Sequence, residues 1–274
     1  MFKIPAKDLV WDITTPQVMG IINCTSDSFY APSRQQNIEE LLLKVGQFEK
    51  EGAAIIDIGA QTTRPNAQLL SADLEIEQLI PVIHAIRKIF PRLLISIDTF
   101  HAKVAQESLE AGANIINDIS CGSFDPAILE VVSKYKAGYI GMHLTGSMHA
   151  MHTIEPRENV MNSLLTYFEE KRKLLLSAGI QQWVIDPGFG FGKTMEENFR
   201  LIRELSQLNS IGLPVLLGAS RKSSIYKTLG ITAEEALNGT SMVHTVALLN
   251  GANIIRVHDV KEAVELVKLL PFLK

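Results

Sequence analysis

The 274-residue sequence contains only two cysteines, Cys24 and Cys121. Two cysteines are too few for the disulfide framework of a small secreted protein, and such scarcity is typical of a reducing cytoplasm. Glycine or proline interrupts each long apolar segment well before it could span a membrane, and residues 1–15 lack the apolar core of a signal peptide. The sequence therefore predicts a cytoplasmic protein without a membrane segment.

Tracts rich in lysine or arginine are also missing. The chain has 26 Lys and Arg against 30 Asp and Glu, a formal net charge of −4. Nucleic-acid binding rests on contacts between basic side chains and phosphates, so nucleic acid is not an expected partner. A small anionic ligand is still compatible, because a few local cations suffice to bind it. The hydrophobic content of 46% is ample for a globular core.

A unit does recur along the chain: a segment with helical periodicity, a glycine, a short β-branched run and then polar residues. The predicted strands are 18–23, 55–58, 94–98, 115–116, 139–143, 183–186, 215–217 and 254–257. Strands that alternate with helices form parallel sheets. Eight of them favour a closed (β/α)8 barrel, the TIM barrel, over an open doubly wound sheet. We expect a single domain spanning residues 1–274, with residues 1–15 covering the bottom of the barrel.

Capping patterns predict where the helices begin and end. The predicted helices are 37–51, 73–89, 103–111, 126–136, 158–177, 196–208, 225–229, 234–249 and 262–270. Capping boxes are predicted at Asn37–Glu40, Thr194–Glu197 and Asp259–Glu262. Gly52 is predicted to end its helix in a left-handed conformation, and Gly138 to close the helix 126–136.

The stretch Val184–Thr194 reads Val-Ile-Asp-Pro-Gly-Phe-Gly-Phe-Gly-Lys-Thr. Pro187 ends the strand because it cannot donate to the sheet. Asp186 is thereby placed at the tip of a strand, beside a glycine-rich loop that a ligand can approach closely. The glycine spacing fits neither a phosphate-binding P-loop nor a dinucleotide-binding fingerprint.

The chemistry of such barrels lies at the C-terminal ends of the strands. The residues predicted there are Asn23, Gly59, Thr62, Thr63, Arg64, Asp98, Asn117, His143, Asp186, Ser220, Arg221, Lys222, Arg256 and His258. Their mixture of charges predicts a ligand with an anionic end and a polar heterocyclic or amide end.

Several of these residues also have structural interpretations. Asp98 could cap the next helix, Asn117 suits either role, and Asp118 is assigned to structure. Alternation along a strand directs Arg256 and His258 to one face. An inward arginine needs a partner, and we interpret that partner as a bound anion.

Other chemistries fit the sequence less well. His143, His149 and His152 invite a zinc site, but the His-x-His on the first strand that a barrel hydrolase needs is missing. Cys24 is predicted to be a small buried hydrophobe rather than a nucleophile.

Taken together, the strand-end motifs resemble those of the dihydropteroate synthase family. The matching stretches, in family order, are Met19–Asn23, Asp27–Phe29, Ile56–Gly59, Thr63–Pro65, Ser96–Thr99, Ile116–Asp118, Met142–His143, Asp186–Lys193, Gly218–Ser223 and Ile255–Val260. The resemblance implies a transferase of folate biosynthesis. It would join 4-aminobenzoate to 6-hydroxymethyl-7,8-dihydropterin diphosphate, giving 7,8-dihydropteroate and diphosphate with the help of Mg²⁺.

The resemblance also implies roles for individual residues. The implied pterin-binding residues are Asp98, Asn117, Asp186 and Lys222. Diphosphate would be held by Thr63, Arg64, Arg256 and His258, and 4-aminobenzoate by Phe29, Pro65, Phe191 and Ser220. Asn23 would help to place Mg²⁺, and the loop residues Asp27, Phe29 and Arg64 would assist catalysis without a general acid or base. A homodimer and sensitivity to sulfonamides are implied as well.

The chain departs from the family pattern in two loops. Ser26 stands where the family usually has proline, and Gln61, Thr62 and Asn66 replace Glu, Ser and Gly. These departures leave one alternative open, and a barrel and pterin pocket shared with another class of enzyme leave a second. A pterin-binding paralogue without synthase activity would bind pterin but form no product. A folate-dependent methyltransferase would bind methyl-tetrahydrofolate and be indifferent to Mg²⁺.

Overall fold

Short runs of isoleucine, valine and leucine form the wall of a barrel. The structure, a computed structural model, describes residues 1–24, 34–61, 69–144, 154 and 157–273. The parallel strands of the wall are β3 (Gln17–Asn23), β4 (Ile55–Gly59), β5 (Leu94–Asp98), β6 (Ile115–Asp118), β7 (Gly138–Met142), β8 (Val184–Asp186), β9 (Leu216–Leu217) and β10 (Ile254–Val257). They follow the order β8-β7-β6-β5-β4-β3-β10-β9, and a parallel bridge between Ile185 and Val215 joins the two ends. The predicted (β/α)8 barrel is confirmed.

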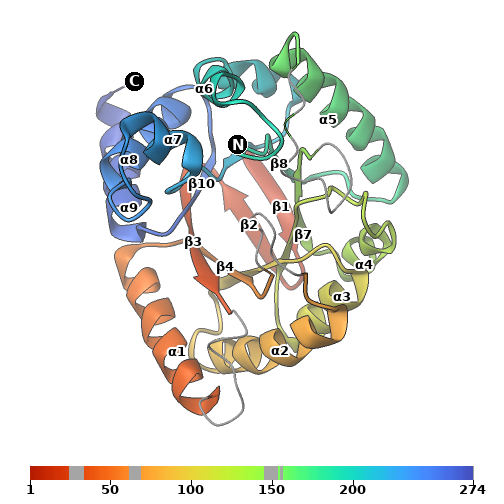
Figure 1. The fold of residues 1–274 in the computed structure, drawn as a ribbon. Helices are drawn as coiled ribbons and strands as arrows, with labels where there is room; N and C mark the ends of the chain where they lie inside the picture. Colours follow the sequence, from red (N-terminus) through yellow and green to blue (C-terminus); the bar gives the residue numbers. More distant parts are fainter. Residues whose placement is uncertain (25–33, 62–68, 145–153, 155–156, 274) are drawn as a thin grey trace.

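The helices surround the strands as an outer layer (Figure 1). The described helices are α1 (Arg34–Glu51), α2 (Ala72–Ile89), α3 (Ala102–Ala111), α4 (Ala127–Tyr135), α5 (Val160–Ser177), α6 (Met195–Arg203), α7 (Ser223–Leu229), α8 (Leu237–Leu249) and α9 (Val260–Leu269), with 3-10 turns η4 (Leu205–Ile211) and η5 (Leu270–Phe272). Between wall and helices lies the main hydrophobic core. Among the described helices, none is both long and apolar enough to cross a lipid bilayer.

An antiparallel hairpin closes the N-terminal end of the barrel. Its strands are β1 (Phe2–Ala6) and β2 (Leu9–Ile13), visible through the barrel in Figure 1. The fully buried Trp11 packs with residues that begin the barrel strands, including Ile55 and Ile254. The prediction that residues 1–15 cover the bottom is thus confirmed, and the C-terminal ends of the strands are left for the site.

Above this apolar bottom the barrel contains a layer of polar side chains. Side chains two residues apart on a strand point the same way. The next inward residues on the strands therefore include Asp57, Ser96, Asn117, Asp186 and Arg256. Parallel pairing sets Asp57 beside Ser96. Asp98, the next inward residue of β5 after Ser96, is paired with Asn117. A barrel with this interior can bury a polar ligand.

Some predicted helix ends are confirmed and others are wrong. Gly52 has the predicted left-handed conformation, with φ 104°, and the Thr194 capping box is present. The box at Asn37 is wrong, because α1 begins at Arg34 and so contains Asn37. Gly138 does not close α4: Lys136 provides the left-handed end, with φ 50°, and Gly138 begins β7.

Candidate active site

Arg256 connects two carboxylates inside the barrel. Its Nε donates to Asp57 Oδ2 at 2.5 Å and its Nη2 donates to Asp98 Oδ2 at 2.7 Å. Burial alone would lower the pKa of Arg256, but the two carboxylates outweigh burial and raise it. The sequence-based interpretation of an arginine that lacks a protein partner is therefore wrong. A role for Arg256 in binding diphosphate stays a prediction from the family.

Sequence reasoning gave no role to Asp57, which is fully buried. Its Oδ2 also accepts a hydrogen bond from Asn117 Nδ2 at 3.1 Å, so Asp57 holds both Asn117 and Arg256. Its Oδ1 and the Oγ of the neighbouring Ser96 have no hydrogen-bond partner among the described residues. Buried polar atoms are normally paired, so this layer retains capacity for a polar ligand. Its position two residues before the end of β4 is the pattern that could have identified Asp57.

Asp98 projects into the site rather than capping α3. Asp125 occupies that place, since its Oδ2 accepts from the backbone N–H of Ala102 at 2.7 Å. Burial raises the pKa of Asp98 above its ordinary value; Arg256 opposes this shift, and Asp57 adds to it. The interpretation of Asp98 as only a helix cap is excluded.

Asp186 and Lys222 approach the site from the other side of the barrel. Asp186 Oδ1 accepts from the N–H of Gly188 at 2.7 Å. Burial raises the pKa of Asp186, and Lys222 counteracts that rise. Lys222 donates to the carbonyl of Phe189, and its Nζ lies 4.4 Å from the centroid of the Phe191 ring. Burial lowers the pKa of Lys222 to about 8, with Asp186 opposing the change.

Ser220 and His258 form a neighbouring pair. Ser220 Oγ lies 3.1 Å from His258 Nδ1 and accepts from the backbone N–H of His258 at 3.2 Å. Burial, and then the charge of Arg256, lower the pKa of His258 to about 4. At neutral pH His258 would therefore contact an anion as a neutral hydrogen-bond donor.

Arg221 and Asp259 form an ion pair with each other. Arg221 donates from Nε to Asp259 Oδ2 at 2.9 Å and from Nη2 to Asp259 Oδ1 at 2.8 Å. Asp259 makes no side-chain cap on α9, so its predicted capping box is wrong. The Asp259 carboxylate bonds to Arg221 and does not cap α9. Arg221 therefore has a structural role.

Lys193 is a second buried residue to which sequence reasoning gave no separate role. Its Nζ lies 2.9 Å from the carbonyl oxygen of Gly188, 3.2 Å from that of Phe191 and 3.1 Å from His143 Nδ1. His143 follows β7 and is itself buried, and burial lowers its pKa to about 2. Neutral His143 therefore contacts Lys193, and it belongs to no metal-ligand group among the described residues.

Other predictions have mixed outcomes. Asp118 is structural, as expected: its carboxylate accepts from Ser120, Gly122 and Tyr139. Cys24 is a fully buried thiol whose pKa burial raises to about 12, which confirms a packing role. Asn23 is an exposed amide at the end of β3. The predicted residues Asp27, Phe29, Thr62, Thr63, Arg64, Pro65, His149 and His152 lie outside the described residues.

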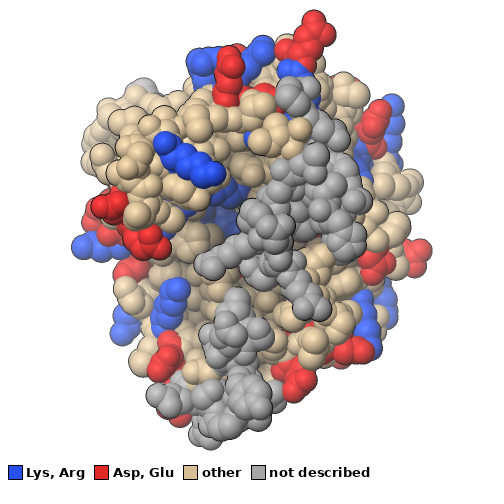
Figure 2. Space-filling view, viewed as in Figure 1, with Lys and Arg blue, Asp and Glu red and all other residues tan. Residues whose placement is uncertain are grey.

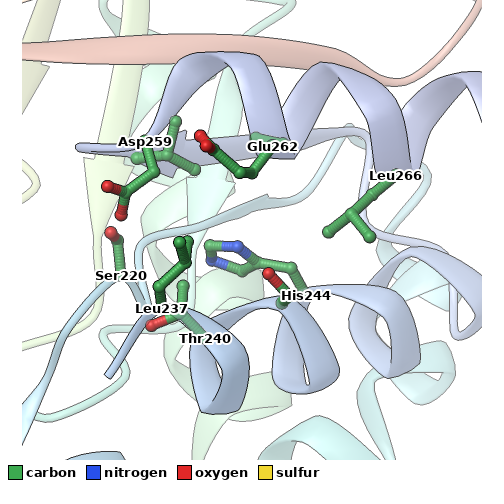
Figure 3. Close-up of a pocket in the computed structure, with 10 residues that line it drawn as sticks. Ser220, Leu237, Thr240, His244, Asp259, Glu262 and Leu266 are labelled. Carbon is green, nitrogen blue, oxygen red and sulfur yellow. The ribbon is translucent and has the colours of Figure 1, made fainter. Parts of the chain in front are cut away.

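A small cavity lies between α8 and α9, beside Ser220 (Figure 3). His244 projects from α8 toward α9, and its Nε2 has no hydrogen-bond partner among the described residues. The cavity volume is about 10 Å³, roughly that needed for one water molecule. This cavity is too small to be the substrate site.

The structure therefore brings together Asp98, Asn117, Asp186, Lys222 and Arg256, as predicted, and adds Asp57 and Lys193. Blue Lys or Arg atoms are visible in the recess near the middle of the face shown in Figure 2. In the part of the chain that the structure describes, no group of three or more His, Cys, Asp or Glu side chains could hold a metal. The arrangement suits a flat polar ligand carrying an anionic group.

Comparisons with known proteins agree with this geometry. The family described as "Pterin binding enzyme" matches residues 19–258. A dihydropteroate synthase of Synechocystis sp. is 38% identical over 255 residues, covering 92% of this chain and 88% of the relative. A Yersinia pestis dihydropteroate synthase in complex with a sulfonamide drug superposes with TM-score 0.91 at 35% identity, covering 99% of each chain. A Xanthomonas albilineans dihydropteroate synthase with 4-aminobenzoic acid gives TM-score 0.89 at 32% identity, covering 99% of this chain and 97% of the other.

The barrel and its polar interior are those of the pterin-binding enzymes, a class of α/β barrels. Identity above 30% over nearly the whole chain narrows the class further. The chain belongs to the dihydropteroate synthase family.

Proposed function

We propose that this transferase joins 4-aminobenzoate to 6-hydroxymethyl-7,8-dihydropterin diphosphate, releasing 7,8-dihydropteroate and diphosphate. The observation that carries the proposal is the polar layer inside the barrel, in a member of the dihydropteroate synthase family. Asp57 and Asp186 are buried in this layer, yet two of its polar atoms, Asp57 Oδ1 and Ser96 Oγ, have no hydrogen-bond partner among the described residues. A ligand with matching polar edges would satisfy them.

The pterin ring matches the chemistry of this layer. Its edge alternates amino and ring N–H donors with carbonyl and ring-nitrogen acceptors. Asp98 and Asp186 can accept from the donors, Lys222 can donate to an acceptor, and the amide of Asn117 can do both. Asp57 would orient Asn117 and Arg256 from beneath.

The reaction needs charge stabilisation rather than a general base. The aromatic amine is already neutral near pH 7, so its nitrogen can attack without first losing a proton. The C–O bond to diphosphate breaks, its electron pair leaves with diphosphate, and the amine forms the new C–N bond and then releases a proton to solvent. Arg256 would stabilise the departing anion while Asp98 and Asp186 stabilise positive charge on the ring.

Mg²⁺ is expected to bind together with the diphosphate. This ion keeps several waters and commonly takes one or two protein ligands plus substrate phosphates. The exposed amide of Asn23 at the end of β3 fits that requirement, whereas a cage of protein side chains would not be needed. When bound, Mg²⁺ would neutralise charge on the leaving diphosphate.

We further propose a homodimer formed through α8. Exposed apolar side chains follow one another on this helix: Met242, Val246 and Leu249 are 66%, 39% and 42% exposed. Contiguous apolar patches of this kind mark protein interfaces. Met242→Glu should turn a dimer into a monomer in light scattering coupled to size exclusion. Leu43→Glu, at a 76% exposed position on α1, should leave the dimer intact; a monomeric parent protein would contradict the proposal.

A coupled assay tests the proposed function directly. The protein is mixed with pterin diphosphate, 4-aminobenzoate and Mg²⁺, and dihydropteroate and free diphosphate are measured. Equal amounts of both products are expected, and a sulfonamide should raise the apparent KM for 4-aminobenzoate. Pterin binding without product would favour a paralogue lacking activity, and binding of methyl-tetrahydrofolate that is indifferent to Mg²⁺ would favour a methyltransferase.

A further inference from the structure

The loop between β8 and α6 is wrapped around the side chain of Lys193. This residue is 4% exposed, and no carboxylate lies within ion-pair distance of its Nζ among the described residues. Its contacts are instead the carbonyl oxygens of Gly188 and Phe191 and the ring of His143. Gly188 has φ 69°, and a Cβ there would lie 2.3 Å from the carbonyl oxygen of His143. Glycine is thus required for the loop to come this close.

Two lysines hold the same loop from different directions. The carbonyls of Gly188 and Phe191 face Lys193, whereas the carbonyl of Phe189 faces Lys222. Lys222 also lies over the ring of Phe191. The position of that ring therefore depends on Lys193 through the main chain and on Lys222 through the ring face. The Phe191 ring is also an expected wall of the 4-aminobenzoate site.

We propose that Lys193 is a positioning residue for the amine substrate: its ammonium group gathers the loop carbonyls and so fixes the Phe191 ring beside Lys222. The proposal rests on the proposed function and assigns a new role within the same site. Lys193 would not touch either substrate.

The charged surroundings of Lys193 are mixed. Burial is the largest cause that lowers the pKa of Lys193 to about 7, and the charges of Arg157 and Lys222 act in the same direction. The carboxylates of Asp186 and Glu197 oppose this change. Retaining an ammonium in such a place is unfavourable unless its hydrogen bonds are used. The three acceptors around Nζ match the three N–H donors of an ammonium. This match favours a role in holding the loop.

The experiment compares Lys193→Met with Lys173→Met, the same substitution at an exposed lysine of α5. Steady-state kinetics are measured for each substrate with the other saturating. Lys193→Met should raise KM for 4-aminobenzoate about tenfold or more, because the charge-assisted bonds that hold the loop and the Phe191 ring in place are lost. KM for pterin diphosphate should change by less than about threefold, since Asp98, Asn117 and Lys222 remain. Lys173→Met should change neither KM.

A double-mutant cycle shows whether Lys193 acts through Phe191. In a Phe191→Ala background, Lys193→Met should change KM for 4-aminobenzoate by less than about twofold. Full additivity, or equal increases in both KM values, would overturn the proposal. If Lys193→Met does not fold, Lys193→Gln takes its place, because its amide keeps two N–H donors, and it must show the same unequal shift. Absence of product with the parent protein would instead refute the proposed function.

Discussion

Replacing Arg256 with alanine should lower the free energy of unfolding by about 3–5 kcal/mol at pH 8, the cost of breaking a buried ion pair from one side. The guanidinium is the shared partner of Asp57 and Asp98, whose side chains are 0% and 19% exposed. Without it, two neighbouring carboxylates would remain inside the barrel with no cation between them. Their desolvation and mutual repulsion would act against the folded state.

The size of this loss should depend on pH. Burial already raises the pKa of Asp98, and Arg256 opposes that rise. In Arg256→Ala the pKa of Asp98 in the folded state should move further above its value of about 3.9 in the unfolded chain. The folded protein then binds a proton more readily than the unfolded chain, so stability increases as the pH falls toward that unfolded value. The difference from the parent protein should therefore be smaller at pH 5.5 than at pH 8.

Urea unfolding at the two pH values measures both effects. Arg203→Ala is a suitable control, because that arginine is 70% exposed and its pairing with Glu204 is on the surface. It should change stability by no more than about 0.5 kcal/mol at either pH. An Arg256→Ala variant as stable as the parent protein at both pH values would contradict the buried pairing.

The sequence predicts the barrel well because its periodicity is repeated. Each strand is a short β-branched run between turn residues, and parallel strands must bring their C-terminal ends to one rim. The strand Leu94–Asp98 was predicted with its observed ends, and Asp98, Asp186, Lys222 and Arg256 do meet. Helix ends were less accurate: Asn37 lies inside α1, and Asp259 bonds to Arg221 instead of capping α9.

What the sequence could not supply was the pairing among the rim residues. The residues around Arg256 in the sequence do not show whether its partner is a bound anion or a side chain of the protein. The partner in the structure, Asp57, lies 199 positions away in the chain. Lys193 presents the same difficulty, because its partners are carbonyl oxygens whose directions follow from the loop conformation. Such contacts are properties of the fold, and only the folded arrangement identifies them.

Lys222→Ala should weaken binding of the pterin substrate about 10- to 150-fold, the equivalent of a lost charge-assisted contact of about 1.5–3 kcal/mol. Lys222 has an electrostatic partner in Asp186 and lies over the Phe191 ring, so its loss affects both predicted substrate sites. Isothermal titration with a pterin ligand measures the change. Lys227→Ala, at an exposed position on α7, should bind like the parent protein.

The pH dependence of the rate gives a second measure of Lys222. Burial lowers its pKa to about 8, so the ammonium form is present below that pH and is lost as the pH rises through it. If pterin binding needs the ammonium, kcat/KM for pterin diphosphate should fall by one decade per pH unit above about pH 8. Arginine keeps its charge throughout this range. In Lys222→Arg the decline should therefore move to higher pH, even where the overall rate is lower. If kcat/KM still declined near pH 8 in Lys222→Arg, the decline would come from the titration of another group. That result would contradict the need for the Lys222 ammonium.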